Sequence, residues 1–306
     1  MTKKMYQKRK ERSMINNNAQ GGQKTGINWY PGHMEKAKRK IKENLKFVDI
    51  VLELIDARVP YSSINNDIFN LINNKSHILI MTKSDLADYD KVQEWVKYYR
   101  KKGIIVILVD LKNKKNIKEI YNEIDKITIT INKERSVKGL KSRRIRLLVV
   151  GIPNVGKSTL INSLVNKKAT ITGNKPGVTK QINWIRVNDK IELLDTPGIL
   201  PPRLTDKEVA LNLAATTAIK EEVLPLEEVA IHIIKKLQSN YPTALRKRYN
   251  IKDDTDIIVI LNSIGKLIGA IKNGEVDYDR VYKTIIKDLR DGYLGKIVFD
   301  IMDCNE

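Results

Sequence analysis

The segment "GIPNVGKSTLINSL", residues 151–164, is the strongest indication of the fold of this chain. It follows the apolar run "IRLLVV" and opens an amphipathic helical pattern, which is the strand-turn-helix context of a phosphate-binding loop. Gly151 and Gly156 let backbone N–H groups turn toward phosphate oxygens. Lys157 is placed to reach the β- and γ-phosphates, and Ser158 to ligate Mg²⁺. The stretch therefore predicts a nucleoside triphosphate site.

Two later motifs complete a phosphate-binding half. "LLDTPGIL", residues 193–200, lies at the end of another apolar run, where Asp195 is suited to hold Mg²⁺ through water and the Gly198 N–H to face the γ-phosphate. Between them, "NKPGVTK" supplies Thr179, whose hydroxyl is suited to be a switch ligand to the metal. An ordinary Pro-Gly turn is the alternative for that segment, and the order of the three motifs favours the switch.

"MTKSD", residues 81–85, matches the guanine-reading pattern [Asn/Thr]-Lys-x-Asp. The pattern arises by chance in roughly one such sequence in three, so its value comes from its place at the end of a predicted strand. There Asp85 would accept hydrogen bonds from the guanine N1–H and amine, and Lys83 would lie over the base. Adenine lacks that donor pair, so an Asp85 carboxylate in this role would reject ATP. An ATPase remains the alternative if Asp85 does not read the base.

Short apolar runs alternate with helical spacers along the first two thirds of the chain. This pattern predicts an α/β fold with a mainly parallel, doubly wound sheet. The expected strands are 48–55, 78–81, 104–109, 145–150, 183–187 and 191–194. The base reader precedes the phosphate loop, which is the reverse of the usual order, but cutting one connection and joining the old ends keeps every strand in place. We expect the join in "TITINKERSVKGLKSRR", residues 128–144, which loses apolar periodicity and is interpreted as a connector.

Composition sets the class of partner. The 306 residues carry a formal charge of +20, which predicts attraction to a polyanion such as RNA, DNA or an anionic membrane. Lys36, Lys38, Arg39, Lys40 and Lys42 are expected on one helix. The single cysteine fits a reducing compartment, and no stretch of eighteen apolar residues occurs, so we expect no membrane span.

Three regions are expected along the chain. Residues 1–27 form a basic arm that we interpret as flexible, and residues 28–204 form the nucleotide-binding domain. After residue 204 apolar residues recur at three- and four-residue spacing, as in "LEEVAIHIIKKLQ", so residues 205–306 are predicted to be a smaller, all-helical domain that binds RNA or the ribosome.

The motifs "WYPGHM", "DARVP", "TKSD", "GIPNVGKSTLIN", "PGVTK" and "DTPGIL", in this order, resemble the YlqF/RbgA family of circularly permuted ribosome-biogenesis GTPases from about residue 28 to the end. The resemblance implies a GTPase that binds a late precursor of the large ribosomal subunit and leaves on hydrolysis. Its partners would be rRNA and ribosomal proteins, with no membrane partner. It implies a bacterial or organellar enzyme that ribosomal particles and K⁺ stimulate, and we expect a monomer. The basic N-terminal segment is rich in Lys, poor in Ser and contains Glu11, unlike a mitochondrial presequence, so we expect the bacterial cytoplasm rather than a mitochondrion.

The resemblance also assigns residues by position. His33 would position the attacking water, because Ile199 stands where Ras-like enzymes place a glutamine; a loop histidine on rRNA is the alternative. Asn154 would coordinate K⁺, and Thr82 replaces the usual asparagine. No residue of the second base loop, "LVDLKNKKN" around Asp110, is assigned a contact. The full GTP-binding set is Thr82, Lys83, Asp85, Asn154, Val155, Gly156, Lys157, Ser158, Thr159 and Gly198. The catalytic set is His33, Lys157, Thr179 and Gly198, with Ser158, Thr179 and Asp195 on Mg²⁺.

A binding module is the alternative in a different functional class. In that reading the basic segment "KAKRKIKENLK" of an RNA-binding scaffold does the main work, and a slowly turning over nucleotide site regulates it. The complete set of phosphate and Mg²⁺ residues argues for the enzyme.

Overall fold

A computed structural model describes residues 32–72, 75–165, 183–200, 206–219, 225–252 and 256–302. The predicted basic arm, residues 1–27, lies outside the described residues. Contacts divide the chain into two compact units, which are taken in turn. Among the described residues, no helix is both long and apolar enough to cross a membrane.

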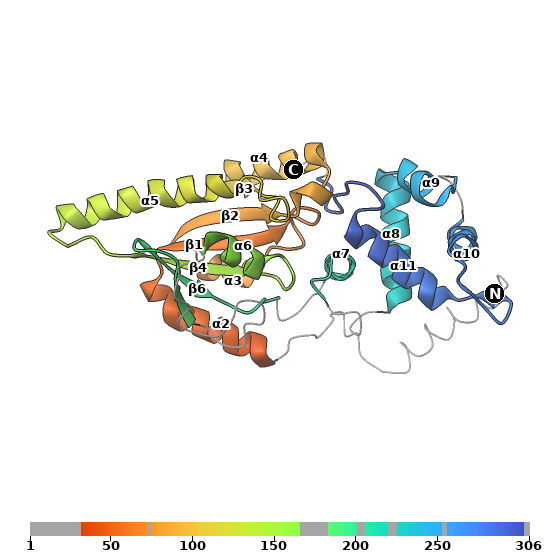
Figure 1. Ribbon diagram of the computed structural model, residues 1–306, viewed down its shortest axis with the longest axis horizontal. Coiled ribbons are helices and arrows are strands. Elements are labelled where there is room, and N and C mark those ends of the chain that lie inside the picture. The colour runs from red at the N-terminus through yellow and green to blue at the C-terminus, as the bar shows by residue number, and fades with distance from the viewer. Residues whose placement is uncertain are drawn as a thin grey trace. The chain divides into compact units, whose positions relative to one another are not determined.

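The first unit is built on a six-stranded sheet with the order β3-β2-β1-β4-β6-β5 (Figure 1). Its strands are β1 (Ile50–Asp56), β2 (Ser76–Thr82), β3 (Ile105–Leu108), β4 (Ile145–Gly151), β5 (Asn183–Arg186) and β6 (Ile191–Asp195). All neighbours are parallel except β5, which is antiparallel to β6. Each expected apolar run is thus a strand, and the mainly parallel sheet is confirmed.

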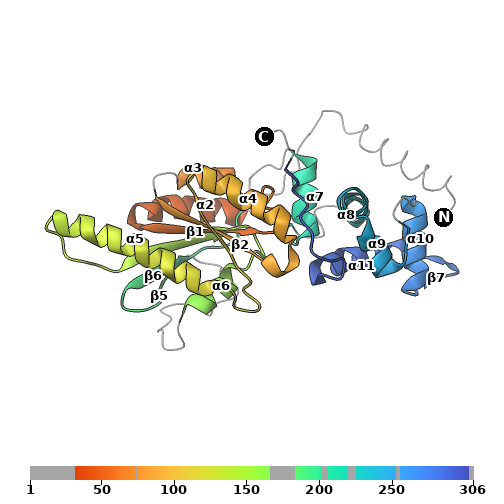
Figure 2. The same cartoon turned by 90° about the horizontal axis from the view of Figure 1, so that it is seen from above.

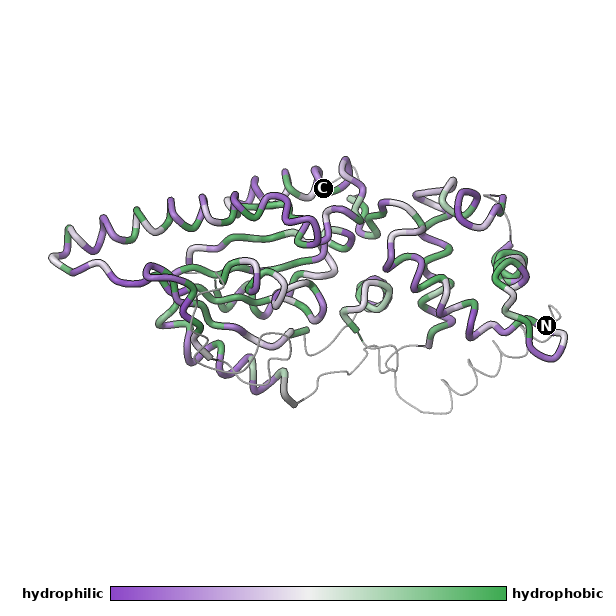
Figure 3. The backbone as a smooth tube through the Cα atoms, in the orientation of Figure 1, coloured by the Kyte–Doolittle hydropathy of each residue, from purple (hydrophilic) through white to green (hydrophobic). Residues whose placement is uncertain are grey.

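Helices cover both faces of this sheet (Figure 2). On one face lie α2 (Gly32–Asn44), α3 (Asn66–Leu71) and α4 (Tyr89–Lys101). Their buried residues, among them Ile41, Ile68 and Trp95, join two apolar clusters with the strands. The other face carries α5 (Ile117–Val137) and α6 (Lys157–Leu164), and the strands between the layers are strongly hydrophobic (Figure 3). Burial of the sheet on both faces explains why its strands read as near-continuous apolar runs.

The basic helix expected from the sequence is α2. It buries Met34, Ala37 and Ile41 and leaves most of its cations exposed, while Lys38 pairs with Asp67 at 2.7 Å. The exposed cations are Lys36, Arg39, Lys40 and Lys42.

The expected connector at residues 128–144 is wrong for its first ten residues, which form the second half of α5. Within α5 the buried residues are Ile120 and Ile124 in its first half. The remaining turns are largely exposed, so they need no apolar repeat to be helical. Only residues 138–144 form an irregular link between α5 and β4.

The second unit contains α8 (Leu226–Asn240), α9 (Thr243–Tyr249), α10 (Ile257–Leu267) and α11 (Tyr278–Asp291). The buried Asp288 carboxylate ties α11 to α9 by accepting from Arg248 Nε at 2.7 Å and Tyr249 Oη at 2.9 Å. The unit also has a hairpin of β7 (Ile271–Lys272) and β8 (Glu275–Val276), which the sequence did not indicate. A Cβ on Gly265 would lie 2.4 Å from Val276 Cγ1, so glycine lets the hairpin approach α10.

The division between the units differs from the predicted boundary at residue 205. Of the described residues after 205, segments 212–219 and 296–302 group with the first unit, and the helix α7 (Lys207–Ala215) is divided between both. Asn212, Val298 and Phe299 are buried there. Helical or apolar patterning shows that a segment is buried but does not show which core buries it, so composition misplaced both segments.

Candidate nucleotide-binding site

The predicted site residues from both halves of the sequence meet at one edge of the sheet. Asp56 pairs in register with Thr82, Leu54 with Gly151, and Val149 with Asp195. All four strands involved are parallel, so their carboxyl ends face the same side. The predicted base-reading loop after β2 and the phosphate loop after β4 therefore lie at the same edge of the sheet, although the predicted base reader comes first in the chain.

The phosphate loop is shaped by left-handed backbone positions. The φ angles are +149° at Gly151, +56° at Asn154 and +109° at Gly156. A Cβ at Gly151 would lie 2.4 Å from the Leu54 carbonyl oxygen, so only glycine fits beside β1. α6 begins directly after Gly156, which aims the N–H groups of its first turn, from Lys157, Ser158 and Thr159, toward the loop. This arrangement is suited to an anion.

Lys157 is buried and folds over the loop. Its Nζ donates to the carbonyl oxygens of Gly151 at 3.1 Å and Ile152 at 2.8 Å. Burial lowers the pKa of Lys157 to about 8, although the Asp195 carboxylate opposes the shift. Burial away from water thus disfavours the charged form of Lys157, and an anionic ligand beside it would favour that form.

The donor set fits Mg²⁺ bound together with a nucleotide. The Ser158 hydroxyl lies in the first turn of α6, and Asp195 ends β6 close enough to influence Lys157. Among the described residues no group of three or more His, Cys, Asp or Glu side chains gathers to hold a metal. A hydroxyl and one carboxylate need phosphate oxygens and water to complete the octahedral shell that Mg²⁺ requires.

The loop after β6 lies directly on the phosphate loop. The Ile199 N–H donates to the Gly151 oxygen at 3.1 Å, and the Thr196 hydroxyl donates to the Val149 oxygen at 2.7 Å. A Cβ on Gly198 would lie 2.6 Å from Pro153 Cα and 3.0 Å from Lys157 Nζ. Position 198 must therefore be glycine for this approach, which brings its backbone to the tip of Lys157.

Thr82 connects the base-reading loop to the phosphate loop. The hydroxyl lies 2.6 Å from the Val155 oxygen and 3.1 Å from the Ile55 oxygen, and it donates best to the nearer of the two. The residue is buried. Thr82 thus stabilises the junction of the two halves with a side chain shorter than the usual asparagine.

Lys83 is held by an ion pair that the sequence analysis missed. Its Nζ lies 2.9 Å from Asp56 Oδ2, and Arg58 donates to both carboxylate oxygens of Asp56 at 3.0 and 2.8 Å. Burial alone would raise the pKa of Asp56, but the Arg58 and Lys83 cations outweigh it and hold the pKa well below its usual range. Lys83 itself has φ +57°. The signal was present in "DARVP", where two charged residues follow an apolar strand.

Asp85 and the loop after β3 lie beside this junction. Asp85 is half-buried in the short 3₁₀ turn Ser84–Leu86. The Ser84 N–H donates to the Val109 oxygen at 3.4 Å, and Leu111 Cδ1 lies 3.0 Å from the place of a Cβ on Gly156. Asp110 turns inward and accepts from Asn113 N at 2.9 Å. The loop predicted as the second base loop therefore lies beside the "TKSD" turn, and its own turn is built on Asp110.

Two of the predicted residues are not fully described, and a third is exposed. Thr179 lies outside the described residues, and so does the side chain of His33, whose backbone is in α2. Asn154 is exposed, and its Nδ2 donates to the Thr217 oxygen at 2.9 Å. That bond leaves the Asn154 Oδ1 atom as the one suited to a cation.

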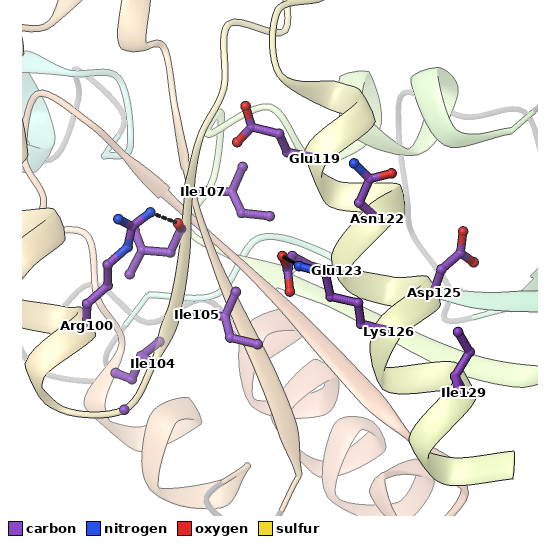
Figure 4. Close-up of a pocket in the computed structure, with 12 residues that line it drawn as sticks. Arg100, Ile104, Ile105, Ile107, Glu119, Asn122, Glu123, Asp125, Lys126 and Ile129 are labelled. Atoms are coloured by element: carbon purple, nitrogen blue, oxygen red, sulfur yellow. Dashed lines mark hydrogen bonds and ion pairs between the residues drawn. The ribbon is translucent and has the colours of Figure 1, made fainter. Parts of the chain in front are cut away.

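A cavity of about 750 Å³ lies elsewhere, between β3 and α5 (Figure 4). Its lining includes Ile105, Ile107 and the acidic side chains of Glu119 and Glu123. Arg100 donates to the Val106 oxygen of the edge strand β3 at 3.1 Å. The cavity contains none of the predicted site residues, and its acidic side chains are unsuited to a polyphosphate.

The family model and the similar sequences are all described as GTPases associated with the ribosome. A family model described as "50S ribosome-binding GTPase" matches residues 146–263, which begin at β4 and exclude the base-reading half. The chain is 42% identical to the ribosome biogenesis GTPase A of Bacillus cereus, over 90% of this chain and 93% of that protein. It is 31% identical to the mouse mitochondrial ribosome-associated GTPase 1, over 89% of each. The structure of GNP-bound YlqF from T. maritima shares the fold, with a TM-score of 0.62 at 24% identity, covering 87% of this chain and 98% of that one.

Proposed function

Since this chain belongs to the ribosome biogenesis GTPase A (YlqF/RbgA) family, we propose that it acts in assembly of the large ribosomal subunit. It binds a late precursor particle in the GTP state and leaves when GTP is hydrolysed. Its permuted GTPase domain carries the reaction, and its place of action is the bacterial cytoplasm.

One observation carries the proposal. The Thr82 hydroxyl lies 2.6 Å from the Val155 oxygen and thereby joins a guanine-reading loop to a phosphate loop 73 residues away in the chain. A chance match to "TKSD" would have no reason to lie against the phosphate loop. This contact supports guanine as the base and "GIPNVGKST" as the triphosphate cradle.

The reaction is attack of water on the γ-phosphate, with GDP as leaving group. Lys157 stabilises the phosphate charge, and the N–H groups of Gly156 and Gly198 are placed for the oxygens that gain charge. Ser158, Thr179 and Asp195 would hold Mg²⁺, which would supply neutralisation of the phosphate charge. His33 orients the attacking water, and Asn154 would hold K⁺, which would supply the positive charge of an arginine finger.

The polyanion partner is rRNA. The +20 charge and the exposed cations of α2, Lys36, Arg39, Lys40 and Lys42, give salt-sensitive attraction to phosphates. Ribosomal proteins complete the docking site, the chain acts as a monomer, and the bound particle accelerates hydrolysis.

The test measures GTP hydrolysis by the full chain with and without large-subunit particles, in K⁺ and in Na⁺. We expect both particles and K⁺ to raise the rate. Asp85→Asn should move the preference from GTP to XTP, because an amide has one acceptor oxygen and cannot accept from both the N1–H and the amine of guanine, whereas its NH2 group can donate to the 2-oxo oxygen of xanthine. An unchanged preference would exclude "TKSD" as the base reader. If the single-turnover rate of GTP hydrolysis is no faster with bound particles than without them, the RNA-binding scaffold is favoured.

A further inference from the structure

The segment 296–302 returns from the helical unit and packs on the base-reading half of the first unit. The Ile297 N–H donates to the Leu86 oxygen at 3.1 Å, and the Phe299 N–H donates to the Arg58 oxygen at 2.8 Å. Val298 and Phe299 are completely buried. This segment, here called the tail, therefore contacts the turn that contains Asp85 and the "DARVP" loop at the same time.

Asp300 anchors the tail through its carboxylate. Oδ2 accepts from the Tyr61 and Ser62 N–H groups, each at 2.8 Å, and Oδ1 accepts from the Ser62 hydroxyl at 2.6 Å. The Asp300 backbone oxygen accepts from Trp95 Nε1 at 2.8 Å. Burial raises the pKa of Asp300, whereas these hydrogen bonds favour the charged form. A buried acceptor surrounded by donors fixes loop geometry more strictly than apolar packing does.

A second segment reaches the same carboxylate. Asn212, in α7, donates to Asp300 Oδ1 at 2.9 Å and to Ser62 Oγ at 3.1 Å. Five residues farther on, the Thr217 oxygen accepts from Asn154 of the phosphate loop. The segment 212–219 follows the Gly198 loop in the chain, so it connects the phosphate half to Asp300.

The base-reading turn has little structure of its own. It begins at Lys83 with a left-handed φ of +57° and consists of the single 3₁₀ turn Ser84–Leu86, whose residues are only half-buried. Its geometry is therefore set by outside contacts, namely Thr82 to Val155, Lys83 to Asp56, Ser84 to Val109 and Leu86 to the tail. The tail contacts Leu86 directly, and it also binds the backbone oxygen of Arg58, whose side chain shares the Asp56 carboxylate with Lys83.

We propose that Asp300 is a positioning residue for guanine recognition and that its bond to Asn212 couples the guanine-reading turn to the segment following the γ-phosphate loop. The inference rests on the proposed GTPase function. Both chain connections of the helical unit, 212–219 and the tail, then meet at one buried carboxylate. Binding that orders the base site then also orders these two connections, and ordering of the connections favours binding at the base site to the same extent.

The test compares Asp300→Asn and Asn212→Ala in the full chain, with Asp291→Asn as an exposed control on α11. Asp300→Asn should raise KM for GTP and Kd for GDP by roughly five- to twentyfold while kcat stays within about twofold. A purely structural role would reduce the active fraction, which lowers apparent kcat and leaves KM unchanged. Asn212→Ala should leave the Kd for GDP unchanged and change the Kd for GTP, so that the ratio of the two affinities differs from that of the wild type. The control should match the wild type.

An unchanged KM in Asp300→Asn, with Asp85→Asn still losing guanine preference, would overturn this inference and leave the proposed function intact. If Asp85→Asn also has no effect, the proposed guanine site itself fails. Should Asp300→Asn not fold, hydrogen exchange on the wild type decides. GDP should slow exchange of the Ile297 and Phe299 amides together with those of residues 84–86, and tail amides that do not respond would overturn the coupling.

Discussion

The two halves of the nucleotide site are built differently. The phosphate half is one contiguous stretch after β4, with geometry set by glycines and a helix start, and its lysine bonds to the loop's own carbonyl oxygens. The base half is a short turn after β2 that depends on Asp56, Val155 and the tail, all distant in sequence.

This difference separates local from tertiary specification. A loop determined by backbone conformation is recognisable from residue types at fixed spacing, because each type allows only certain φ angles. A turn that is held by distant contacts has no such spacing of residue types in its own sequence. Only the residues that would touch the ligand can be recognised there. We expect substitutions in the phosphate half to change chemistry or phosphate affinity, and those in the base half to change stability or base recognition.

The largest expected effect is in the base half. Asp56→Asn should lower the free energy of unfolding by roughly 3–5 kcal/mol, measured by urea titration, because it leaves the buried Arg58 and the Lys83 cation without their anion. The neighbours hold the pKa of Asp56 below its usual 3.8. Its contribution is therefore complete above that pH and lost as the pH falls through the folded pKa. The free energy of unfolding of the variant should therefore fall less than that of the wild type when the pH is lowered. Asp189→Asn, at an exposed pair with Arg186, is the control and should match the wild type.

Lys157→Met tests the phosphate half. GTP and GDP affinity should fall about 100-fold, because a buried cation at the phosphates is lost. Stability without nucleotide should not fall, since burial that lowers the Lys157 pKa to about 8 already disfavours the charge. Fluorescent nucleotide binding and thermal unfolding measure the two quantities. Retained affinity would contradict the assignment of the loop. Lys126→Met, at a largely exposed lysine of α5 that contacts no part of the phosphate loop, serves as the control.

Gly198→Ala separates the γ-phosphate contact from binding. The added methyl would lie 2.6 Å from Pro153 Cα, so the loop must move away from the phosphate loop. Hydrolysis should slow roughly tenfold to thirtyfold, and GDP affinity should stay the same because GDP has no γ-phosphate. Gly139→Ala is the control, because no atom lies within 4 Å of its Cβ, although its φ of +70° strains a side chain in a way that Gly198 does not. That control should keep wild-type hydrolysis, and equal losses in both variants would show that the contact with Pro153 is not the cause.

The smallest expected effect is at the junction of the halves. Thr82→Val keeps the shape but removes the hydroxyl that donates to the Val155 oxygen, which should cost about 1 kcal/mol of stability. GTP and GDP affinity should fall together by a few-fold. Thr82→Ser retains the donor and should bind as the wild type does. If Val and Ser behave alike in calorimetric titration, the contact does not connect the two loops.

Several structural features could not be predicted from the sequence. The outer half of α5 is exposed and has no apolar repeat to reveal it. The Asp56–Lys83 ion pair joins the ends of two strands, and the Asn154 bond to Thr217 spans 63 residues. Such contacts form only when separate segments meet, so neither composition nor spacing contains them.

The six strands and the phosphate loop follow from the amino-acid order alone, because apolar runs and glycine positions reflect requirements that act within a few residues. The reversed order of the two halves is also visible there. The packing of 212–219 and the tail on the first unit, and the hydrogen bonds by which Asp300 joins them, appear only in the folded structure. A buried hydrogen bond depends on which groups meet in space, and chain order does not fix that.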